Sequence, residues 1–365
     1  MFNREYNSTN FITSLRAIAI MMVFLIHSGG GGLRELFSFG DRVVDMGKYG
    51  VDMFFVISGF TIFYQFYTRN YTIKNFFKVR LLRVSIPYFP LLIFIYIYIA
   101  LGGVSTNYWA TMYNQGEISF LNLLTHFLYI SYIDVKFANT IIGVEWTLSI
   151  EVFYYILLGV LIANFQKLIT LKEIVYGLGL FFIISMLGLY IAKISDTLIL
   201  YAWLPFKYGY MFLLGGLAYK IRVKLQESVK VQYLNKYSNI VLLFGVISFF
   251  IFMVFTLIPN KGIINELFFS LWTFMLIVFV QDSAKLSGFL VSKLMLWLGS
   301  ISFSMYLLHM IIIKSAFLKI NLVSQNSSLN FIYLLFITLF LSSVYYWIFE
   351  MKLYRSIKNK VRSND

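Results

Sequence analysis

The first apolar segment of the chain, SLRAIAIMMVFLIH, carries two ionisable side chains, Arg16 and His27. An α-helix turns about 100° per residue, so their spacing brings both side chains to within about 20° of one face, roughly 16 Å apart. Histidine, whose unperturbed pKa is about 6.5, can accept a proton from a hydroxyl group at neutral pH. The alternatives are a snorkelling arginine at one helix end and a histidine that caps the other.

Two carboxylates follow in apolar surroundings. Asp52 begins the run GVDMFFVISGF, and we expect an antiparallel neighbour to place it at about the depth of His27. A carboxylate there fixes the tautomer of the imidazole, although Asp52 could equally stabilise its own helix N-terminus. Glu151 lies in WTLSIEVFYY, nearly two turns deeper than Glu145. At that depth it must pair, stay protonated or line water.

A basic segment, residues 67–85, contains five Lys and Arg residues and no acid. We predict a loop that either anchors the protein by the positive-inside rule or binds an anionic ligand. Arg80 and Arg83 sit one helical turn apart and can fork onto phosphate. The sequence has no Gly-rich phosphate loop of the Walker type, which argues against a nucleotide-hydrolysing pump.

The remaining candidates are less specific. His309 ends the apolar run SFSMYLLH, and an ionisable group inside a membrane span indicates function by default. Ser58, in FFVISGF, is a further candidate. His126 lies in a shorter apolar run, and we predict a structural role for it without a predicted partner. We predict no metal site.

Composition places this chemistry in a membrane. The chain is 60% hydrophobic and only 13% charged, with a mean hydropathy of +0.78. Soluble domains are about half apolar and about a quarter charged. We therefore predict an all-α integral membrane protein. The absence of cysteine excludes disulfides, thiolate metal sites and a cysteine nucleophile.

Length and hydropathy predict ten transmembrane helices, since a span needs about 20 mostly apolar residues. One transmembrane domain is expected over residues 1–365, with its motifs in 12–350 and no appended soluble domain. The run 120–133 is too short to span and predicts a re-entrant or interfacial helix. The predicted spans are 11–28, 51–67, 86–101, 141–164, 174–192, 200–219, 239–258, 263–280, 294–316 and 330–350.

Loop charges predict the orientation. With the N-terminus inside, the inner segments hold 21 of the 30 Lys and Arg residues and the outer segments hold 9. Basic residues favour the cytoplasmic side, so both termini are predicted to be cytoplasmic. The net charge of +14 is explained by this asymmetry and does not indicate nucleic-acid binding.

Five motifs in order resemble the membrane acyltransferase-3 family, bacterial acyltransferases that O-acetylate surface polysaccharides. They are the Arg16–His27 spacing, FFVISGF, RLLR, WTLSIE and SFSMYLLH, and the resemblance covers residues 12 to about 350. It implies ten transmembrane helices in the bacterial cytoplasmic membrane, an acyl-CoA donor, usually acetyl-CoA, and a glycan or lipid-linked sugar acceptor. It implies no permanently bound cofactor.

The resemblance also assigns residues by position. Arg16 and His27 match the family's first-helix pair, Arg80 and Arg83 its cytoplasmic arginine motif, Glu151 the glutamate of WSLSVE-like segments and His309 the histidine that ends SYSLYLLH-like segments. We accordingly predict His27, Asp52 and Glu151 as catalytic residues, Arg16, Arg80 and Arg83 as acyl-CoA-binding residues, and Ser58 and His309 as further candidates.

Two other functions fit the same composition. A transporter or flippase of a lipid-linked sugar would also have ten spans and buried charges along its substrate path. A non-catalytic membrane partner could retain the fold, because function belongs to sites rather than folds. Donor chemistry separates these alternatives, since a transporter should neither bind acetyl-CoA nor release CoA.

The topology can be tested with single cysteines, because the natural chain has none. We expect a cysteine at Met112 to react with an impermeant thiol reagent in intact cells, and one at Asn70 to react only after the membrane is opened. Labelling of position 70 but not of position 112 in intact cells would invert the predicted orientation.

Overall fold

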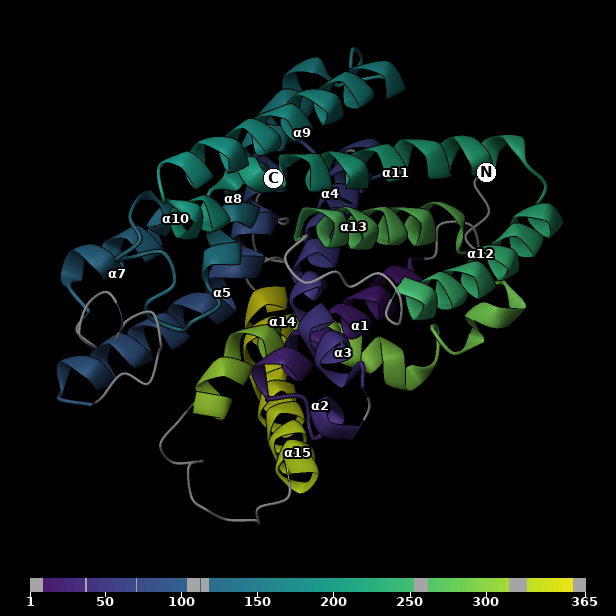
Figure 1. The fold of residues 1–365 in the computed structure, drawn as a ribbon. Coiled ribbons are helices and arrows are strands. Elements are labelled where there is room, and N and C mark those ends of the chain that lie inside the picture. The colour runs from purple at the N-terminus through teal and green to yellow at the C-terminus, as the bar shows by residue number, and fades with distance from the viewer. Residues whose placement is uncertain are drawn as a thin grey trace. The chain divides into compact units, whose positions relative to one another are not determined.

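The computed structural model describes residues 9–36, 38–69, 71–103, 112, 118–252, 262–314 and 327–356. Within these ranges the chain forms helices and turns and no strand (Figure 1). It divides into two compact units, each built from segments far apart in the sequence. Unit 1 comprises Met1–Tyr64, Lys167–Gly179 and Tyr210–Ser302, and unit 2 comprises Gln65–Gln166, Leu180–Gly209 and Phe303–Asp365.

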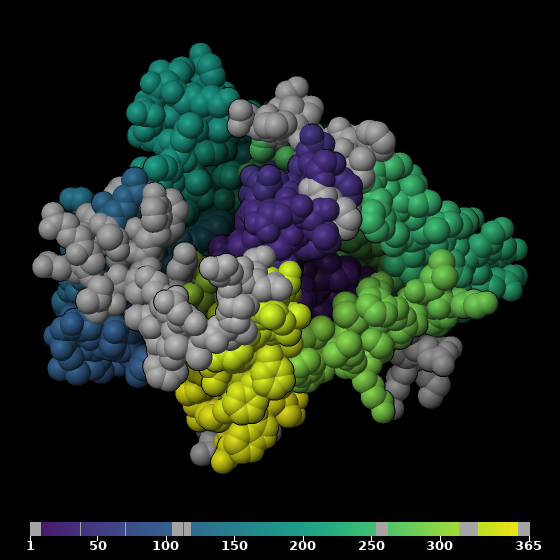
Figure 2. Space-filling model, turned by 60° about the horizontal axis from the view of Figure 1, so that its bottom comes forward, coloured from purple at the N-terminus to yellow at the C-terminus, as the bar shows by residue number. Residues whose placement is uncertain are grey.

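Eight helices in the described ranges are long and apolar enough to cross a membrane. Many of their exposed side chains are large and apolar, which is the pattern expected where lipid rather than water is the solvent. Figure 2 shows the yellow C-terminal segment at the surface of one face. In its helix α15 (Ser327–Tyr345), the side chains of Phe336 and Phe340 are exposed, as is that of Trp347 in the π-helix that follows. The protein is therefore an all-α, multi-pass membrane protein, as predicted. The eight helices cover Asn10–His27, Ile73–Ala100, Trp146–Phe165, Leu171–Ile194, Val231–Ile251, Gly262–Phe279, Lys293–Ile313 and Ser328–Tyr354.

Unit 1 holds the N-terminal helix and most of the second half of the chain. Its elements are α1 (Asn10–His27), α2 (Leu33–Leu36), α3 (Gly40–Asp45), η1 (Met46–Tyr49), α4 (Gly50–Tyr67) up to Tyr64, α11 (Gly209–Ser228) from Tyr210, α12 (Val231–Ile251), α13 (Gly262–Phe279), η5 (Lys285–Gly288) and the first parts of α9 (Leu171–Ile194) and α14 (Lys293–Lys314).

Unit 2 is built around two long helices, α5 and α8. Its elements are α5 (Ile73–Ala100), α7 (Phe120–Phe127), η2 (Ser131–Ile133), α8 (Trp146–Phe165), the second part of α9, α10 (Leu198–Trp203), η3 (Pro205–Tyr208), the end of α14, α15 (Ser327–Tyr345) and η6 (Tyr346–Tyr354). The last of these is a π-helix.

Three predicted boundaries are wrong. The basic segment 67–85 is mostly helical, because α5 begins at Ile73 after Thr72, whose hydroxyl oxygen accepts the N–H of Asn75. Lysine and arginine are good helix formers, so their charge marks a membrane surface without ending the helix. The span expected at 141–164 becomes helical only at Trp146.

The third wrong boundary is the span expected at 200–219. Pro205 ends α10 because it lacks an amide N–H, and a short 3₁₀ turn, η3, separates α10 from α11. The short run after residue 120 forms only the eight-residue helix α7 and a 3₁₀ turn, which confirms that it does not span.

The number of ten spans stays a prediction. Helices occupy the expected second and sixth positions as α4 and α11, but neither is among the eight helices that qualify by length and composition. The location of both termini also stays a prediction, because residues 1–8 and 357–365 lie outside the described residues.

The start of α1 is held by ionic groups of unit 1. The carboxylate of Asp282 accepts the backbone N–H groups of Asn10 at 3.1 Å and Phe11 at 3.0 Å, two donors that have no partner within the helix. The buried Arg222 donates to the carbonyl oxygens of Ile277 and Val280, and its guanidinium lies 4.7 Å from the Phe11 ring centroid. These contacts fix the helix that carries Arg16 and His27.

Helices α4 and α11 approach closely through two glycines. A Cβ atom at Gly59 would lie 2.0 Å from the carbonyl oxygen of Phe212, and one at Gly215 would lie 2.1 Å from that of Val56. The two backbones can be this close only because neither position has a side chain, the usual solution for helix packing in membranes.

We expect Gly59→Ala and Gly215→Ala each to lower the stability of the protein by about 1–3 kcal/mol, because the new methyl group forces the helices apart. Thermal unfolding in detergent measures the change. Gly179→Ala is the matched control: a Cβ atom there would meet nothing within 4 Å, and alanine favours the helix more than glycine does. Equal melting temperatures for all three variants would contradict this account of the α4–α11 contact.

Candidate functional site

Unit 1 carries four of the predicted site residues. Arg16 and His27 both lie on the uninterrupted helix α1 and are partly buried, as the spacing argument requires. Asp52 and Ser58 lie on α4 and are buried, with exposed fractions of 5% and 7%. The roles of these residues in a reaction stay predictions. The structure shows at which levels α1 and α4 lie beside each other.

Helix α1 runs antiparallel to the segment that opens α4. A Cβ atom at Gly47 would lie 2.2 Å from the carbonyl oxygen of Met22, and one at Gly50 would lie 2.4 Å from that of Ala19. From Gly47 to Gly50 the chain advances by three residues, and the residue that it contacts on α1 moves back by three, from Met22 to Ala19.

This register corrects the depth expected for Asp52. Two residues beyond Gly50, Asp52 is level with about Ala17, roughly 15 Å along the axis from His27. It also lies about 200° around α4 from Gly50 and so on a different face from the one packed on α1. The depth match that suggested a pair with His27 is therefore wrong, whereas a role for Asp52 in the reaction stays a prediction.

The loop before α4 is held by ordinary surface ion pairs. Arg34 donates to Asp41 at 2.9 Å and to Asp45 at 2.8 Å. The hydrogen bonds that Arg34 donates to Asp41 and Asp45, together with their negative charges, raise the pKa of Arg34 above its ordinary value, although burial opposes this. Exposed pairs contribute little to stability, so these contacts shape the loop.

Unit 2 contains a buried cation on α5. Arg80 is 2% exposed; its Nε donates to the side-chain oxygen of Gln65 at 2.7 Å and its Nη1 to the hydroxyl of Tyr155 at 3.4 Å. The guanidinium carbon lies 5.0 Å from the Tyr155 ring centroid and 5.9 Å from that of Phe76. Its Nη2 is buried without a hydrogen-bond partner in the described part of the chain.

The same cluster contains two carboxylates. The hydroxyl of Tyr155 donates a short hydrogen bond to Glu151, one turn away on α8, so Tyr155 connects Arg80 to Glu151. Arg83 interacts electrostatically with Glu151 and with Glu350, which lies in the π-helix η6. The unit therefore brings the two predicted arginines and the predicted glutamate together.

Glu350 completes this cluster from the C-terminal helix. Its carboxylate accepts the hydroxyl of Ser304 on α14 at 2.6 Å. π-Helices are rare and occur frequently at functional sites, because the wider turn re-aims side chains. Glu350 was not predicted from the sequence, since a lone acid near a chain end has no distinguishing pattern.

His309 is fully buried on α14. Its Nδ1 lies 2.7 Å from the carbonyl oxygen of Tyr306 and 3.1 Å from that of Met305. Because a carbonyl only accepts hydrogen bonds, Nδ1 carries the proton and Nε2 is the basic nitrogen of the neutral ring. This tautomer suits a proton acceptor, which keeps His309 among the candidates.

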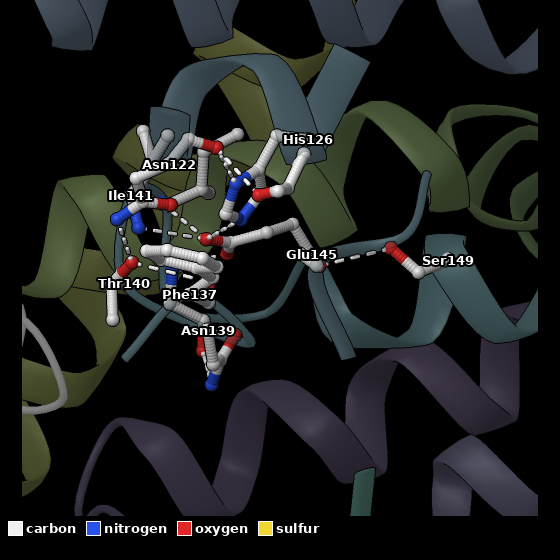
Figure 3. A network of polar contacts seen from close by, with 12 residues as sticks. Asn122, His126, Phe137, Asn139, Thr140, Ile141, Glu145 and Ser149 are labelled. Carbon is white, nitrogen blue, oxygen red and sulfur yellow. Dashed lines mark hydrogen bonds and ion pairs between the residues drawn. The ribbon is translucent and has the colours of Figure 1, made fainter. Parts of the chain in front are cut away.

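A second buried ionic cluster of unit 2 centres on Glu145, at the residue before α8 (Figure 3). Nε2 of His126 lies 3.2 Å from its Oε1, and both side chains are buried. Nδ1 of His126 lies 2.9 Å from the carbonyl oxygen of Asn122. The carboxylate also accepts four backbone N–H groups: Ile141 at 2.8 Å and Ile142 at 3.0 Å on Oε1, and Gly143 at 2.6 Å and Val144 at 2.9 Å on Oε2.

The comparison with known proteins decides the family. The profile of a family described as "Acyltransferase domain" matches residues 9–347. The chain belongs to the acyltransferase-3 family. Neither curated proteins nor solved structures give a match. The protein is therefore a membrane acyltransferase, and at the family level the acceptor is of the polysaccharide type.

In this acyltransferase the Glu145 cluster organises the turn that precedes α8. Gly143 has φ of +103°, a conformation that favours glycine, and its carbonyl oxygen accepts the Asn139 side chain at 2.8 Å. Both nitrogens of His126 face acceptors within the cluster, so its imidazole is engaged in holding this turn. The structural role predicted for His126 fits this geometry, and Glu145 is the partner that the sequence analysis lacked.

Sequence reasoning missed three members of these clusters. Tyr155 lies four residues after Glu151, a spacing that places both on one helix face, so it could have been found. Gln65 and Glu350 come from distant segments, and only tertiary packing brings them to the arginines. No group of three or more His, Cys, Asp or Glu side chains in the described ranges could hold a metal ion.

We expect Glu145→Gln to destabilise the acyltransferase by about 3 kcal/mol or more, because an amide nitrogen cannot accept the N–H groups that Oε2 accepts and so leaves buried donors without a partner. Thermal unfolding and hydrogen exchange of residues 141–144 measure the effect. The control is Glu173→Gln, an exposed glutamate. If Glu145→Gln keeps full stability and loses only turnover, Glu145 is a reaction group rather than a structural one.

Proposed function

We propose that this acyltransferase transfers an acetyl group from cytoplasmic acetyl-CoA to a hydroxyl group of a cell-surface or lipid-linked glycan. The proposal includes a location in the bacterial cytoplasmic membrane, with no permanently bound cofactor. The observation that carries it is the placement of a cation, Arg16, and a titratable imidazole, His27, along one apolar helix of an acyltransferase.

The donor enters this scheme from the cytoplasm. CoA has a charged nucleotide end that cannot cross hydrocarbon, so only its pantetheine arm can run between the helices. Arg83 and the Nη2 of Arg80 can donate hydrogen bonds to polar groups of that arm. Arg16, on α1 of unit 1, is proposed as a further acyl-CoA-binding residue.

The reaction needs one base and one acid. In a direct transfer, the imidazole of His27 takes the proton of the acceptor hydroxyl while the hydroxyl oxygen attacks the thioester carbonyl. The carbon–sulfur bond then breaks, and the imidazolium returns the proton to the sulfur of CoA. Glu151 and Asp52 are proposed to stabilise charge during these steps, and His309 and Ser58 remain further candidates.

The test uses the purified protein in nanodiscs with acetyl-labelled acetyl-CoA and glycan fractions from the host. We expect label in the glycan and an equal amount of free CoA. Movement of a lipid-linked sugar across the disc without CoA release would overturn the proposal in favour of a transporter.

We expect His27→Ala to lower kcat by about 10²- to 10⁴-fold while acetyl-CoA still binds, because it removes the base and leaves the donor contacts. Arg83→Ala should mainly raise the KM for acetyl-CoA, the signature of lost uniform binding. Arg80 is a poorer probe, since its loss also strands Gln65 and Tyr155.

His126→Asn removes an imidazole from the buried Glu145 cluster, so we expect it to lower the melting temperature and to leave the kcat of the folded protein unchanged. Steady-state kinetics and donor titration together separate the two roles. If His27→Ala only weakens donor binding and Arg83→Ala abolishes turnover at saturating donor, the assigned roles are reversed.

A further inference from the structure

Arg80 and Arg83, the arginines predicted to hold the donor phosphates, already have carboxylates near them inside unit 2. Arg80 is connected to Glu151 through Tyr155, and Arg83 interacts with Glu350 as well as Glu151. Arg80 and Arg83 therefore lie in one cluster with two carboxylates, Glu151 and Glu350. Nearby carboxylates weaken the long-range attraction of buried cations for an anion.

Most hydrogen-bonding nitrogens of Arg80 already have partners within the protein. Its Nε and Nη1 already donate to side chains of unit 2, and aromatic rings lie near the guanidinium. The remaining Nη2 could hold one polar atom. A nucleotide with a pyrophosphate and a 3′-phosphate carries about four negative charges, which these groups cannot neutralise.

Exposed cations lie at the same end of unit 2, on two helices in contact. The hydroxyl of Tyr345 donates a short hydrogen bond to the carbonyl oxygen of Pro87, and that of Tyr354 lies 3.4 Å from the carbonyl oxygen of Val79. The end of η6 is therefore level with the second turn of α5.

Four basic residues lie on these two stretches, and we call them the cationic collar: Lys74 and Lys78 in the first turns of α5, and Lys352 and Arg355 at the end of η6. Lys74, Lys352 and Arg355 are exposed, and Lys78 is partly exposed. Lys352 lies 5.5 Å from the ring centroid of Trp347, an attraction that orients the ammonium and leaves its charge in place.

We propose that the cationic collar binds the pyrophosphate and 3′-phosphate of the acyl-CoA donor. This inference rests on the proposed function and names the phosphate-binding part of its donor site. Flexible, exposed lysines and an arginine suit a polyphosphate that enters from water, because each cation keeps part of its hydration while it pairs. Phosphate headgroups of anionic lipids have the same chemistry and are the competing source of ligand.

The experiment compares three acetyl donors that share one thioester: acetyl-CoA, its 3′-dephospho derivative and acetyl-pantetheine, which has no phosphate. The variant Lys352→Gln/Arg355→Gln is measured in nanodiscs of neutral lipid and of lipid with anionic headgroups. Lys193→Gln, at the other end of the long helices of unit 2, is the matched control for loss of an exposed cation.

In neutral discs at low salt we expect the double variant to raise the KM for acetyl-CoA roughly tenfold, with less effect on the dephospho donor and none on acetyl-pantetheine. kcat should not change, and added salt should reduce the difference because the contacts are exposed. Arg355→Lys should lose little, since it keeps the charge.

Other outcomes overturn the inference. An equal rise of KM for all three donors indicates a distorted site. A rise of KM seen only in anionic discs indicates that the collar binds lipid headgroups. No change of KM in either kind of disc shows that the collar does not bind the donor. In each case, turnover of acetyl-pantetheine by the natural protein shows that the acyl transfer itself stands. If the natural protein uses none of the three donors, the proposed function fails instead.

Discussion

The cost of burying charge in an apolar protein governs this structure. A carboxylate or guanidinium removed from water must find counter-charges and hydrogen bonds within the protein, because lipid offers neither. Glu145 meets this requirement with four backbone N–H groups and His126, and Arg80 meets it with Gln65 and Tyr155. The ionic groups of unit 2 are therefore rigid parts of the fold as well as candidates for chemistry.

The two ionic clusters of unit 2 lie on either side of Thr147–Ile150, in the first turns of α8. Glu145 fixes the turn from which α8 begins, and Glu151 and Tyr155 are one and a half to two and a half turns further along the same helix. Anything that shifts the start of α8 along its axis also shifts Glu151 relative to Arg80. The structural acid and the candidate catalytic acid are thus coupled through one helix.

Close helix packing supplies the other constraint. Glycines remove the side chains where α4 meets α11, and the α4 segment reaches α1 through Gly47 and Gly50. These contacts set the register of unit 1 and hence the levels of Asp52 and His27. An acyltransferase that brings a cytoplasmic thioester to an external hydroxyl needs such fixed levels, because the reacting atoms must meet within about 3–3.5 Å.

The sequence by itself determined the membrane class, the helical content, the helix that carries Arg16 and His27, and the family, because hydropathy and local motifs are properties of short segments. It could not determine the helical nature of 73–85, since basic residues mark a membrane surface whether or not the helix continues. The level of Asp52, the burial of Arg80 and the pair of His126 with Glu145 depend on contacts between distant segments. Only the tertiary structure decided these, because the pairing of buried charges is set by which helices pack together and in what register.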